Sequence, residues 1–390
     1  MINRKLRMGM IGGGPGAFIG AVHRIAANMD GEIELVCGAF SSDPEKSKQT
    51  GQELNLPMNR VYGSYKEMIR AEAELPPSER MDIVSIVTPN HVHFEPAKLA
   101  LEKRAFHVIL DKPLAFNLDE AKKLHEIAKK SQLQFCLTHT YTGYPMVKEA
   151  RHFVQSGKLG RIRKIYVDYP QGWLSQFLEG AAPDSKSFKQ ASWRTDPTQS
   201  GSAGAMGDIG THAFNLAEYV SGLKVTHICA DINIVVDGRK LDDDGTVMLK
   251  FENGASGFLY ATQVAAGEEN NTKVRVYGEK GGIEWKQEDA NTLLVRWFDK
   301  PAEIYRAGTP YLSSFAKHNI RTPAGHPEGY LEAFANLYRN FALCVKAQIA
   351  GITPQPEWLD FPGVEDGLRG MEFVEKVLES GKSEIKWTKL

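Results

Sequence analysis

Short apolar runs alternate with helix-like segments over the first part of the chain. The run 6–11 predicts a buried strand, and the apolar pairs Ala21/Ile25 and Val22/Ala26 that follow it recur at helical spacing. Further strands are expected at 34–40, 81–87, 105–110 and 134–138, and a helix is expected at 118–131. Strands that alternate with helices in this way predict a doubly wound parallel sheet of the α/β class.

The second half of the chain is richer in strand-like runs, which turn residues separate. Such turn signals stand at 252–254 (Glu-Asn-Gly) and 279–282 (Glu-Lys-Gly-Gly). Strands are expected at 162–169, 225–236, 245–251, 255–264, 272–278, 281–286 and 292–297. Two closing helices are expected near 329–350 and 364–380, where apolar residues recur at helical spacing. No internal repeat or low-complexity tract interrupts the pattern.

Composition narrows the class of protein. The chain has 390 residues, of which 42% are hydrophobic and 24% charged, and its formal net charge is −1. These values are typical of a globular protein with two substantial cores, and they give no support to a nucleic-acid partner. There is no run of 18 apolar residues and no signal peptide, so we expect a cytoplasmic protein without a membrane partner. The cysteines lack metal-ligand spacing and are expected to be buried free thiols; they are Cys37, Cys136, Cys229 and Cys344.

A glycine-rich segment follows the first expected strand. Gly12, Gly14 and Ala17 fit the pattern G-x-G-x-x-A, with Gly16 and Phe18 in the same loop. The first glycine makes a tight turn, the second lets the backbone approach a pyrophosphate, and the third small residue lets the helix pack closely on the strand. The free N–H groups at the start of the helix then bind the phosphates. This segment therefore predicts dinucleotide binding.

The end of the second expected strand bears on the choice of dinucleotide. An NAD-binding fold usually places an acidic residue there for the ribose 2′-hydroxyl. This chain instead has Ser41 and Ser42, with Asp43 slightly later and no arginine for a 2′-phosphate. We expect NAD, with NADP not excluded. The alternative for this segment is the N-cap of the next helix.

Polar residues also follow two other expected strands. Thr88, Asn90 and His93 come after the strand 81–87, and Asp111 and Lys112 come after the strand 105–110. Because ligands of such sheets lie beyond the carboxyl ends of the strands, we expect these residues to face the same crevice as the glycine loop. A lysine at a strand end and before a proline is less typical of an ordinary surface lysine.

A carboxylate and an imidazole stand four residues apart in the second half. If Asp208 and His212 occupy one helix, both side chains lie on the same face. A neighbouring carboxylate fixes the tautomer of a histidine and raises its basicity, as a general base near neutral pH requires. Without further motifs, an Asp/His pair on a helix face is more often an ordinary surface contact.

Taken together, these motifs resemble the Gfo/Idh/MocA family of NAD(P)-dependent oxidoreductases. The resemblance covers nearly the whole chain and includes the glycine loop, Thr-Pro-Asn at 88–90, Asp-Lys-Pro at 111–113 where the family usually has Glu-Lys-Pro, Trp-Arg-Thr-Asp-Pro at 193–197, and Gly-Asp-Ile-Gly-Thr-His at 207–212. It implies a Rossmann domain at 1–145 and, at 146–390, an α/β domain with a large, open, mostly antiparallel sheet. It further implies closing helices that pack back on the first domain, and a homodimer or homotetramer.

The resemblance also implies roles for individual residues. His212 is then the proton acceptor, Asp208 orients it, and Lys112 donates a hydrogen bond to the reacting oxygen, although Lys112 is an alternative proton acceptor. The expected cofactor-binding residues are Gly12, Gly14, Gly16, Ala17, Phe18, Ser41, Ser42, Thr88, Asn90, His93, Asp111 and Lys112. No metal is expected.

The substrate side is expected to combine aromatic and polar residues suited to a polyhydroxylated ring. The expected substrate-binding residues are His139, Tyr141, Tyr144, Trp193, Arg194 and His326. Alternatives remain for most of them: core packing for the two tyrosines, an ion pair between Arg194 and Asp196, and a helix start at His326. The polar connection 174–192 is a candidate lid or subunit-contacting arm.

We therefore expect an NAD-dependent dehydrogenase that acts on a ring secondary alcohol of a sugar, glycoside or cyclitol, with oxidation at C3 of a glycoside as one form of this reaction. One alternative is a glycosidase that uses bound NAD for transient C3 oxidation and elimination. A second alternative is a non-catalytic regulator that senses NAD(P). Loss of Lys112, Asp208 or His212 would favour the regulator, and all three are present.

Overall fold

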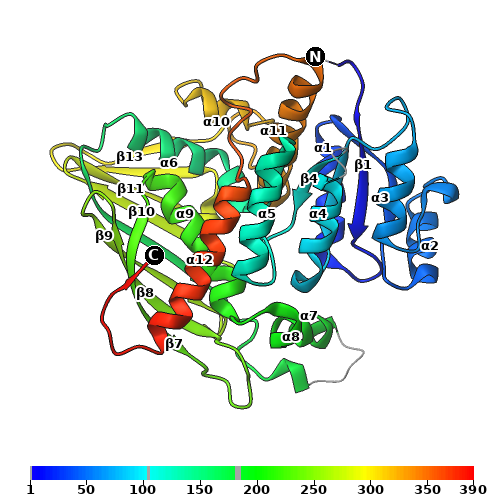
Figure 1. Cartoon of the computed structure of the whole chain (residues 1–390). Coiled ribbons are helices and arrows are strands. Elements are labelled where there is room, and N and C mark those ends of the chain that lie inside the picture. The colour runs from blue at the N-terminus through cyan, green and yellow to red at the C-terminus, as the bar shows by residue number, and fades with distance from the viewer. Residues whose placement is uncertain (1, 103–105, 181–185) are drawn as a thin grey trace. The chain divides into compact units, whose positions relative to one another are not determined.

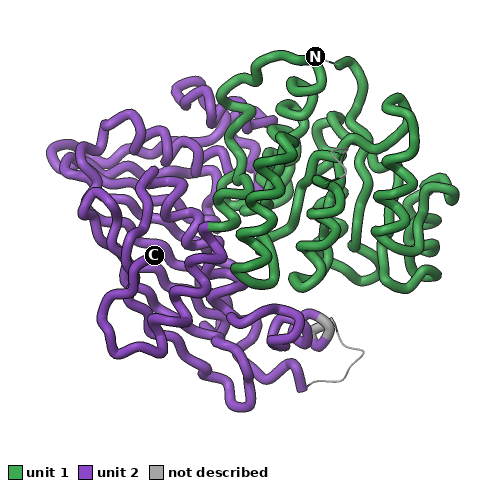
Figure 2. The backbone as a smooth tube through the Cα atoms, viewed as in Figure 1, with its two compact units in different colours: residues 1–143, 330–368 green, residues 144–329, 369–390 purple. Residues whose placement is uncertain are grey.

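A computed structural model of the protein describes residues 2–102, 106–180 and 186–390. The chain forms two compact units (Figure 2), and each is built from separated stretches of sequence. Unit 1 comprises Met1–Gly143 and Tyr330–Leu368, and unit 2 comprises Tyr144–Gly329 and Arg369–Leu390. No helix within the described ranges is long and apolar enough to cross a membrane.

Unit 1 is built on a parallel five-stranded sheet with the strand order β2-β1-β3-β4-β5. The strands are β1 (Leu6–Gly12), β2 (Ile33–Ala39), β3 (Ile83–Val87), β4 (His107–Leu110) and β5 (Phe135–Leu137). The order reverses at β1, which pairs with β2 on one side and β3 on the other. The strands bury both faces, as the continuous apolar runs in the sequence predict. This is the doubly wound sheet expected from the sequence.

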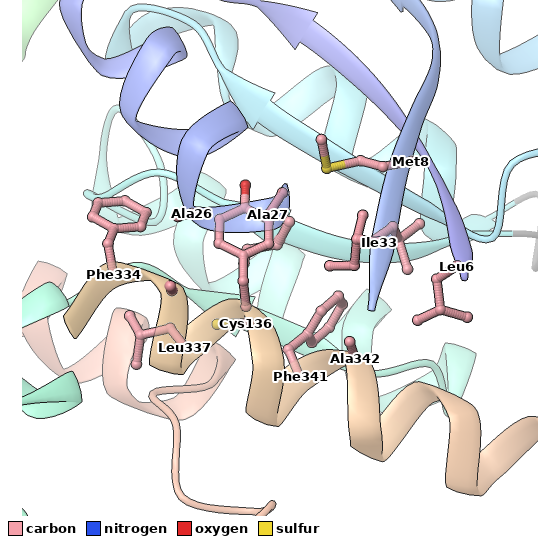
Figure 3. Close-up of a cluster of buried hydrophobic side chains, with 14 of the residues drawn as sticks. Leu6, Met8, Ala26, Ala27, Ile33, Cys136, Phe334, Leu337, Phe341 and Ala342 are labelled. Atoms are coloured by element: carbon pink, nitrogen blue, oxygen red, sulfur yellow. The ribbon is translucent and has the colours of Figure 1, made fainter. Parts of the chain in front are cut away.

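Helices surround the unit 1 sheet. They are α1 (Phe18–Met29), α2 (Pro44–Glu53), α3 (Tyr65–Glu74), α4 (Phe94–Glu102), α5 (Leu118–Ser131) and α11 (Tyr330–Ala350), with short helices at Met58–Arg60, Asn90–Val92 and Thr140–Gly143. Figure 3 shows how α11 enters the unit 1 core: Phe334, Leu337 and Phe341 pack against side chains of α1, β1 and β2. Helix α11 is remote in sequence from the other helices of unit 1, yet its apolar side chains form part of the hydrophobic core of that unit.

Unit 2 contains a nine-stranded sheet with the order β13-β12-β11-β10-β6-β9-β8-β7-β14. Its strands are β6 (Ile162–Pro170), β7 (Val225–Asn233), β8 (Asp244–Phe251), β9 (Ser256–Thr262), β10 (Lys273–Gly278), β11 (Gly281–Lys286), β12 (Thr292–Trp297), β13 (Glu303–Arg306) and β14 (Thr388–Lys389). All neighbouring pairs are antiparallel except β6 and β9, which run parallel. The expected α/β class with a large, mostly antiparallel second sheet is confirmed.

One face of this sheet packs against helices, and the strands alternate accordingly between buried and more exposed positions (Figure 1). The helices of unit 2 are α6 (Pro145–Gln155), α7 (Lys186–Arg194), α8 (Pro197–Ser200), α9 (Thr211–Ser221), α10 (Ser314–His318) and the unit 2 part of α12 (Val364–Gly381), with short helical turns at Leu178–Gly180, Met206–Gly210 and Gln287–Asp289. The rings of Phe214 on α9 and Phe373 on α12 stack 4.4 Å apart and bring these two helices together.

Several local expectations require correction. The strand predicted at 225–236 ends at Asn233, because the backbone N–H groups of Val235 and Val236 turn to donate to the carboxylate of Asp243. The strand predicted at 255–264 ends at Thr262. Two edge strands, β13 and β14, were not predicted, because β13 buries no residue fully and β14 has only two residues.

The polar connection 174–192 is more structured than its composition suggests. It includes the turn Leu178–Gly180 and part of α7, while residues 181–185 lie outside the described ranges. The guanidinium of Arg239 holds its first part, since it donates to the carbonyl oxygens of Leu174 and Gln176 and pairs with Glu179. These contacts fix the first part of the connection, residues 174–179, within unit 2.

Candidate active site

The glycine loop after β1 has the backbone that a pyrophosphate requires. Gly12, Gly13 and Gly16 adopt positive φ angles of 85°, 74° and 73°, which side chains of L-residues disfavour. A Cβ atom at Gly12 would stand 2.7 Å from the carbonyl oxygen of Val87, and one at Gly14 would stand 2.7 Å from the carbonyl oxygen of Phe40. Gly12 and Gly14 therefore cannot be replaced without a collision, because a side chain at either position would meet the backbone at the end of a neighbouring strand.

The start of α1 is open to an anion. Ala17 is its N-cap residue, no side chain caps the helix, and no acidic residue stands in its first turn. Phe18 begins the helix with 64% of its surface exposed. The close helix–loop contact lies at Gly20, where a Cβ atom would stand 2.4 Å from the Cα atom of Gly13. Sequence reasoning placed that packing role on Ala17 and did not single out Gly20.

Thr88 offers a further polar group near this loop. Its Oγ1 atom is buried and has no hydrogen-bond partner among the described residues, and its methyl group lies against Gly12. Asn90, two residues later, is buried at the start of the short helix Asn90–Val92. An orphaned hydroxyl and a side-chain-free cradle together fit a dinucleotide at this edge of the sheet.

The segment after β2 caps the N-terminus of helix α2. The carboxylate of Asp43 accepts hydrogen bonds from the backbone N–H groups of Glu45 and Lys46 at the start of α2. Ser41 is partly buried and its Oγ atom accepts a hydrogen bond from the N–H of Asp43, while Ser42 is exposed. The capping alternative for this segment is confirmed, and Asp43 is directed toward the helix.

Lys112 follows strand β4, and both of its chain neighbours, Asp111 and Pro113, make contacts with other segments of unit 1. Before it, the Oδ1 atom of Asp111 accepts a hydrogen bond from the Thr138 hydroxyl at 2.8 Å and lies 3.6 Å from Nε2 of His23. After it, the carbonyl oxygen of Pro113 lies 2.7 Å from Nδ1 of His93. Lys112 itself is half-buried. The contacts fix the backbone that carries the lysine.

The Asp111 carboxylate is stabilised in its charged form. Burial acts to raise its pKa, but the hydrogen bond and charge of His23, the charge of Lys112 and the hydrogen bond of Thr138 together hold the pKa well below its usual value. Lys112 therefore has a permanent anion as its chain neighbour. Aspartate at position 111 thus supplies the negative charge that the family usually has from glutamate.

His93 occupies a structural position within unit 1. Its ring is buried, with Nδ1 near the Pro113 carbonyl and Nε2 2.9 Å from the carbonyl oxygen of Thr88. Burial lowers its pKa, although the carbonyls and Asp111 act in the opposite direction. The imidazole therefore links the loops after β3 and β4, which carry Thr88 and Lys112.

His139 is a second buried imidazole under the influence of Lys112. It follows β5 and is 2% exposed. Burial and the charge of Lys112 lower its pKa to about 3, against the opposing effect of Asp111. The ring is thus neutral at neutral pH and suited to hydrogen bonding rather than to charge stabilisation.

A hydrogen-bonded group beneath this strand end was not predicted. The hydroxyl of Tyr338 on α11 lies 2.7 Å from Nδ1 of His23 and 2.9 Å from Oγ of Ser85. Nε2 of His23 faces Asp111. No local sequence signal could have revealed this group, because Tyr338 comes from the other end of the chain.

In unit 2, Asp208 and His212 lie in one continuous helical segment. Asp208 is in a π-helical turn, Met206–Gly210, which passes directly into α9, where His212 is 8% exposed. A π-helical turn inside an α-helix is frequent at functional sites. The ring of Tyr169 at the end of β6 lies 6.3 Å from that of His212, measured between centroids.

The start of this helical segment is fixed by a buried carboxylate. Asp242 accepts hydrogen bonds from the backbone N–H groups of Gly204 at 2.6 Å and Met206 at 2.7 Å. Burial raises the pKa of Asp242 despite these hydrogen bonds. A Cβ atom at Gly204 would stand 2.0 Å from the Asp242 carbonyl oxygen, so only glycine permits this approach. Asp242 was not predicted as part of the site.

The polar partners of Asp208 in unit 2 include Gln263 and Arg194. Its Oδ2 atom accepts a hydrogen bond from Nε2 of Gln263 at 2.9 Å and lies 3.6 Å from Nε of Arg194. The guanidinium of Arg194 also lies over the ring of Trp193, 4.3 Å from its centroid. Asp196 caps α8. The structure thus pairs Arg194 with Asp208.

The other expected substrate residues occupy varied positions. Tyr141 is 4% exposed, and Tyr144 is 2% exposed with its ring 5.1 Å from that of Trp285. His326 is exposed and precedes α11. Its segment, 326–330, leads into α11, which begins at Tyr330, and the carboxylate of Glu328 accepts hydrogen bonds from the backbone N–H groups of Arg321 and Thr322.

Among the residues that the structure describes, no group of three or more His, Cys, Asp or Glu side chains could hold a metal ion.

Comparison with known proteins identifies the chain. Residues 6–139 match the family described as "Oxidoreductase family, NAD-binding Rossmann fold", and residues 147–284 match the GFO/IDH/MocA C-terminal domain. An uncharacterized oxidoreductase of Bacillus subtilis, YfiI, is 30% identical over 391 residues, which cover 99% of this chain and 97% of that protein. The chain belongs to the Gfo/Idh/MocA family. It is an oxidoreductase with an NAD-binding Rossmann domain.

Two relatives of this Gfo/Idh/MocA protein have more informative names. The crystal structure of an inositol dehydrogenase homolog from Azotobacter vinelandii in complex with NAD+ is 32% identical, has a TM-score of 0.92, and aligns over 100% of this chain and 98% of that chain. The levoglucosan dehydrogenase of Pseudarthrobacter phenanthrenivorans is 26% identical over 325 residues, which cover 77% of this chain and 78% of that enzyme.

Proposed function

We propose that this protein is an NAD-dependent dehydrogenase that oxidises a secondary alcohol on the ring of a sugar, glycoside or cyclitol to a ketone. The observation that carries the proposal is the strand end at Lys112, where a lysine next to a charged, half-buried Asp111 follows the strand beside Thr88 and the glycine loop. The inositol dehydrogenase homolog and the levoglucosan dehydrogenase, whose names denote ring alcohols, support the substrate class.

Oxidation of an alcohol removes a hydride from carbon and a proton from oxygen. The nicotinamide of NAD, when bound, accepts the hydride. For the rest of the chemistry we assign His212 as the proton acceptor, Asp208 as the group that orients it, and Lys112 as the donor to the reacting oxygen, with Lys112 as the alternative proton acceptor. A positive hydrogen-bond donor at an alkoxide-like oxygen is worth about 3–4 kcal/mol of barrier.

We assign the cofactor to the edge of the unit 1 sheet. Gly12, Gly13, Gly14 and Gly16 provide the backbone cradle, the open start of α1 faces the phosphates, and Thr88 provides a hydroxyl. The further residues assigned to this site are Ala17, Phe18, Ser41, Ser42, Asn90, Asp111 and Lys112, and the buried His93 supports it by linking the loops after β3 and β4. We assign His139, Tyr141, Tyr144, Trp193, Arg194 and His326 to the substrate side.

The test is the absorbance of reduced nicotinamide. The purified protein is mixed with NAD or NADP and a panel of cyclitols, monosaccharides, disaccharides and methyl glycosides. Net reduction with a ring alcohol supports the dehydrogenase. Turnover of a nitrophenyl glycoside without added NAD, by protein that retains cofactor, would instead establish the glycosidase. Cofactor binding without either activity would establish the regulator.

We further propose a cytoplasmic homodimer or homotetramer. Support comes from the face of the unit 2 sheet opposite α6 and α9, where Tyr166 and Phe258 stack 4.6 Å apart and Met248 is 42% exposed. An open sheet face with apolar and aromatic residues is typical of a subunit interface. Light scattering of the eluting protein measures the mass, and a monomer at micromolar concentration would contradict this proposal.

A further inference from the structure

The ends of the parallel strands β6 and β9 bring two glutamines together. Pro170, the last residue of β6, pairs with Thr262, the last residue of β9, and a glutamine follows each strand. The Nε2 atom of Gln263 lies 3.4 Å from Oε1 of Gln171 and 2.9 Å from Oδ2 of Asp208. The same amide thus connects the neighbouring strand to the carboxylate of the proposed site.

Gln171 extends this arrangement away from Asp208. Its Oε1 atom accepts a hydrogen bond from the indole N–H of Trp173 at 3.0 Å, and its Nε2 atom donates to Oδ1 of Asn270 at 2.6 Å. The same Asn270 oxygen accepts a hydrogen bond from the hydroxyl of Tyr169 at 2.8 Å. Each side chain therefore fixes the rotamer of the next, and together they form what we call the amide row: Gln263, Gln171, Trp173 and Asn270.

Charge is balanced at the Asp208 end of the amide row. The guanidinium of Arg194 lies 3.6 Å from Asp208 and also lies over the ring of Trp173, 5.8 Å from its centroid. The cation and the carboxylate offset each other, and the remaining members of the row are neutral. Such a row presents neutral donors and acceptors, which suit uncharged hydroxyl groups, and it offers a phosphate no net positive charge.

Gln263 is the member best placed to act on a substrate. Its side chain is buried at 3% exposure, and it donates directly to the carboxylate proposed to orient the base. The amide oxygen of Gln263 accepts no hydrogen bond from the described residues, and this oxygen is not fully buried. An amide that donates on one side and has an accessible acceptor on the other can bridge a carboxylate and a hydroxyl.

We propose that Gln263 is a substrate-orienting residue that holds Asp208 in place and accepts a hydrogen bond from a ring hydroxyl of a neutral polyol. The amide row supports it, and the inferred substrate class is an uncharged sugar or cyclitol. This inference rests on the proposed dehydrogenase function. It adds Gln263 as the residue that selects the ring. It also predicts that a sugar phosphate is not the preferred substrate.

The test combines substitutions with deoxy substrates. Rates are measured with NAD and either myo-inositol or methyl α-D-glucoside, and with the monodeoxy derivatives of each. Gln263→Met removes the amide, and we expect roughly a tenfold or greater loss of kcat/KM on the parent polyol. For the derivative that lacks the contacted hydroxyl, wild type and variant become nearly equal. A substitution that only disturbed the structure would lower all rates by the same factor.

A second variant separates the two roles of the amide. Gln263→Glu retains an oxygen that accepts the hydroxyl but cannot donate to Asp208, so kcat should fall while the discrimination between parent and deoxy substrate remains. The matched control is Gln348→Met. Gln348 is an exposed residue of α11, and its amide makes two hydrogen bonds, one with the side chain of Gln134 and one with the carbonyl oxygen of Gln132. NADH affinity, measured by fluorescence titration, and the thermal midpoint verify that each variant folds.

The outcomes distinguish this inference from the proposed function. Uniform losses on all derivatives, or no loss in Gln263→Met, overturn the role of Gln263 and leave the dehydrogenase intact. Oxidation of glucose 6-phosphate in strong preference to every neutral polyol also overturns it. If wild type oxidises no alcohol and its NADH complex binds neither probe by calorimetry, both this inference and the proposed function are wrong.

Discussion

The imidazole of His23 and the phenol of Tyr338 are 315 residues apart in the sequence, yet Nδ1 and the hydroxyl oxygen lie 2.7 Å apart in the core of unit 1. Burial raises the pKa of Tyr338 well above its usual value, so the phenol keeps its proton. On the other side of the ring, Nε2 of His23 lies 3.6 Å from Oδ1 of Asp111. Helix α11 therefore packs its phenol against the histidine that faces the carboxylate next to Lys112.

Tyr338→Phe should lower the free energy of unfolding by about 1–2 kcal/mol, because it removes a buried hydroxyl that lies 2.7 Å from Nδ1 of His23 and 2.9 Å from Oγ of Ser85. Urea denaturation measures this loss. The matched control is Tyr65→Phe, since the hydroxyl of Tyr65 makes no hydrogen bond with the described residues. Equal stability of the two variants would show that the hydroxyl of Tyr338 contributes nothing to the core.

Lys112→Ala should lower turnover by at least roughly a hundredfold while NAD affinity stays within a few-fold, because the lysine is assigned to the reacting oxygen. Steady-state rates and NADH fluorescence titration measure the two quantities. Lys122→Ala, at an exposed position of α5, is the control. Near-normal turnover in Lys112→Ala would remove this residue from the chemistry.

His212 and His139 should differ in their effect on the pH–rate profile. His139 has a pKa of about 3 and stays neutral over the working range, so His139→Gln should retain any inflection that wild type shows near neutrality. His212→Asn should lower kcat by roughly 10²–10⁴ and abolish that inflection. Rates measured between pH 5 and 9 show which variant loses the inflection. If His139→Gln loses it and His212→Asn keeps it, the base is His139 and not His212.

Stability should fall in mild acid through His107 at the start of β4. Burial lowers its pKa to about 4, whereas an unfolded histidine titrates near 6.5. The unfolded chain therefore binds the proton first, and stability is lost as the pH falls from about 6.5 to about 4. His107→Gln removes this dependence, worth about 2–3 kcal/mol over that window. Urea midpoints at pH 7 and pH 4.5 measure it, and parallel curves would contradict the assignment.

The sequence predicted the elements that have local signals. The glycine loop, the parallel strands and the strand end at Lys112 follow from residue patterns within a few positions, since turns, buried runs and helix spacing are local properties. The spacing of Asp208 and His212 was considered only for the case that both lie on one helix, and the structure places them in one continuous helical segment. Edge strands such as β13 were missed because they bury too little surface to leave a pattern.

The amide row and the His23–Tyr338 pair had no such signal. Gln171 and Gln263 meet only because β6 and β9 pair in parallel with Pro170 opposite Thr262, and nothing near either glutamine specifies that register. Likewise, Asp242 became part of the site because its carboxylate reaches the backbone of Gly204 and Met206.

The sequence alone therefore determined the fold class, the family resemblance and three residues of the proposed chemistry, Lys112, Asp208 and His212. Only the tertiary structure decided which groups hold them: Asp111 with His23 and Thr138, and Asp208 with Gln263 and Arg194. The physical reason is that backbone geometry and hydrophobic periodicity act between near neighbours in the chain. Buried polar groups instead take their partners from any segment that packing brings within hydrogen-bond distance.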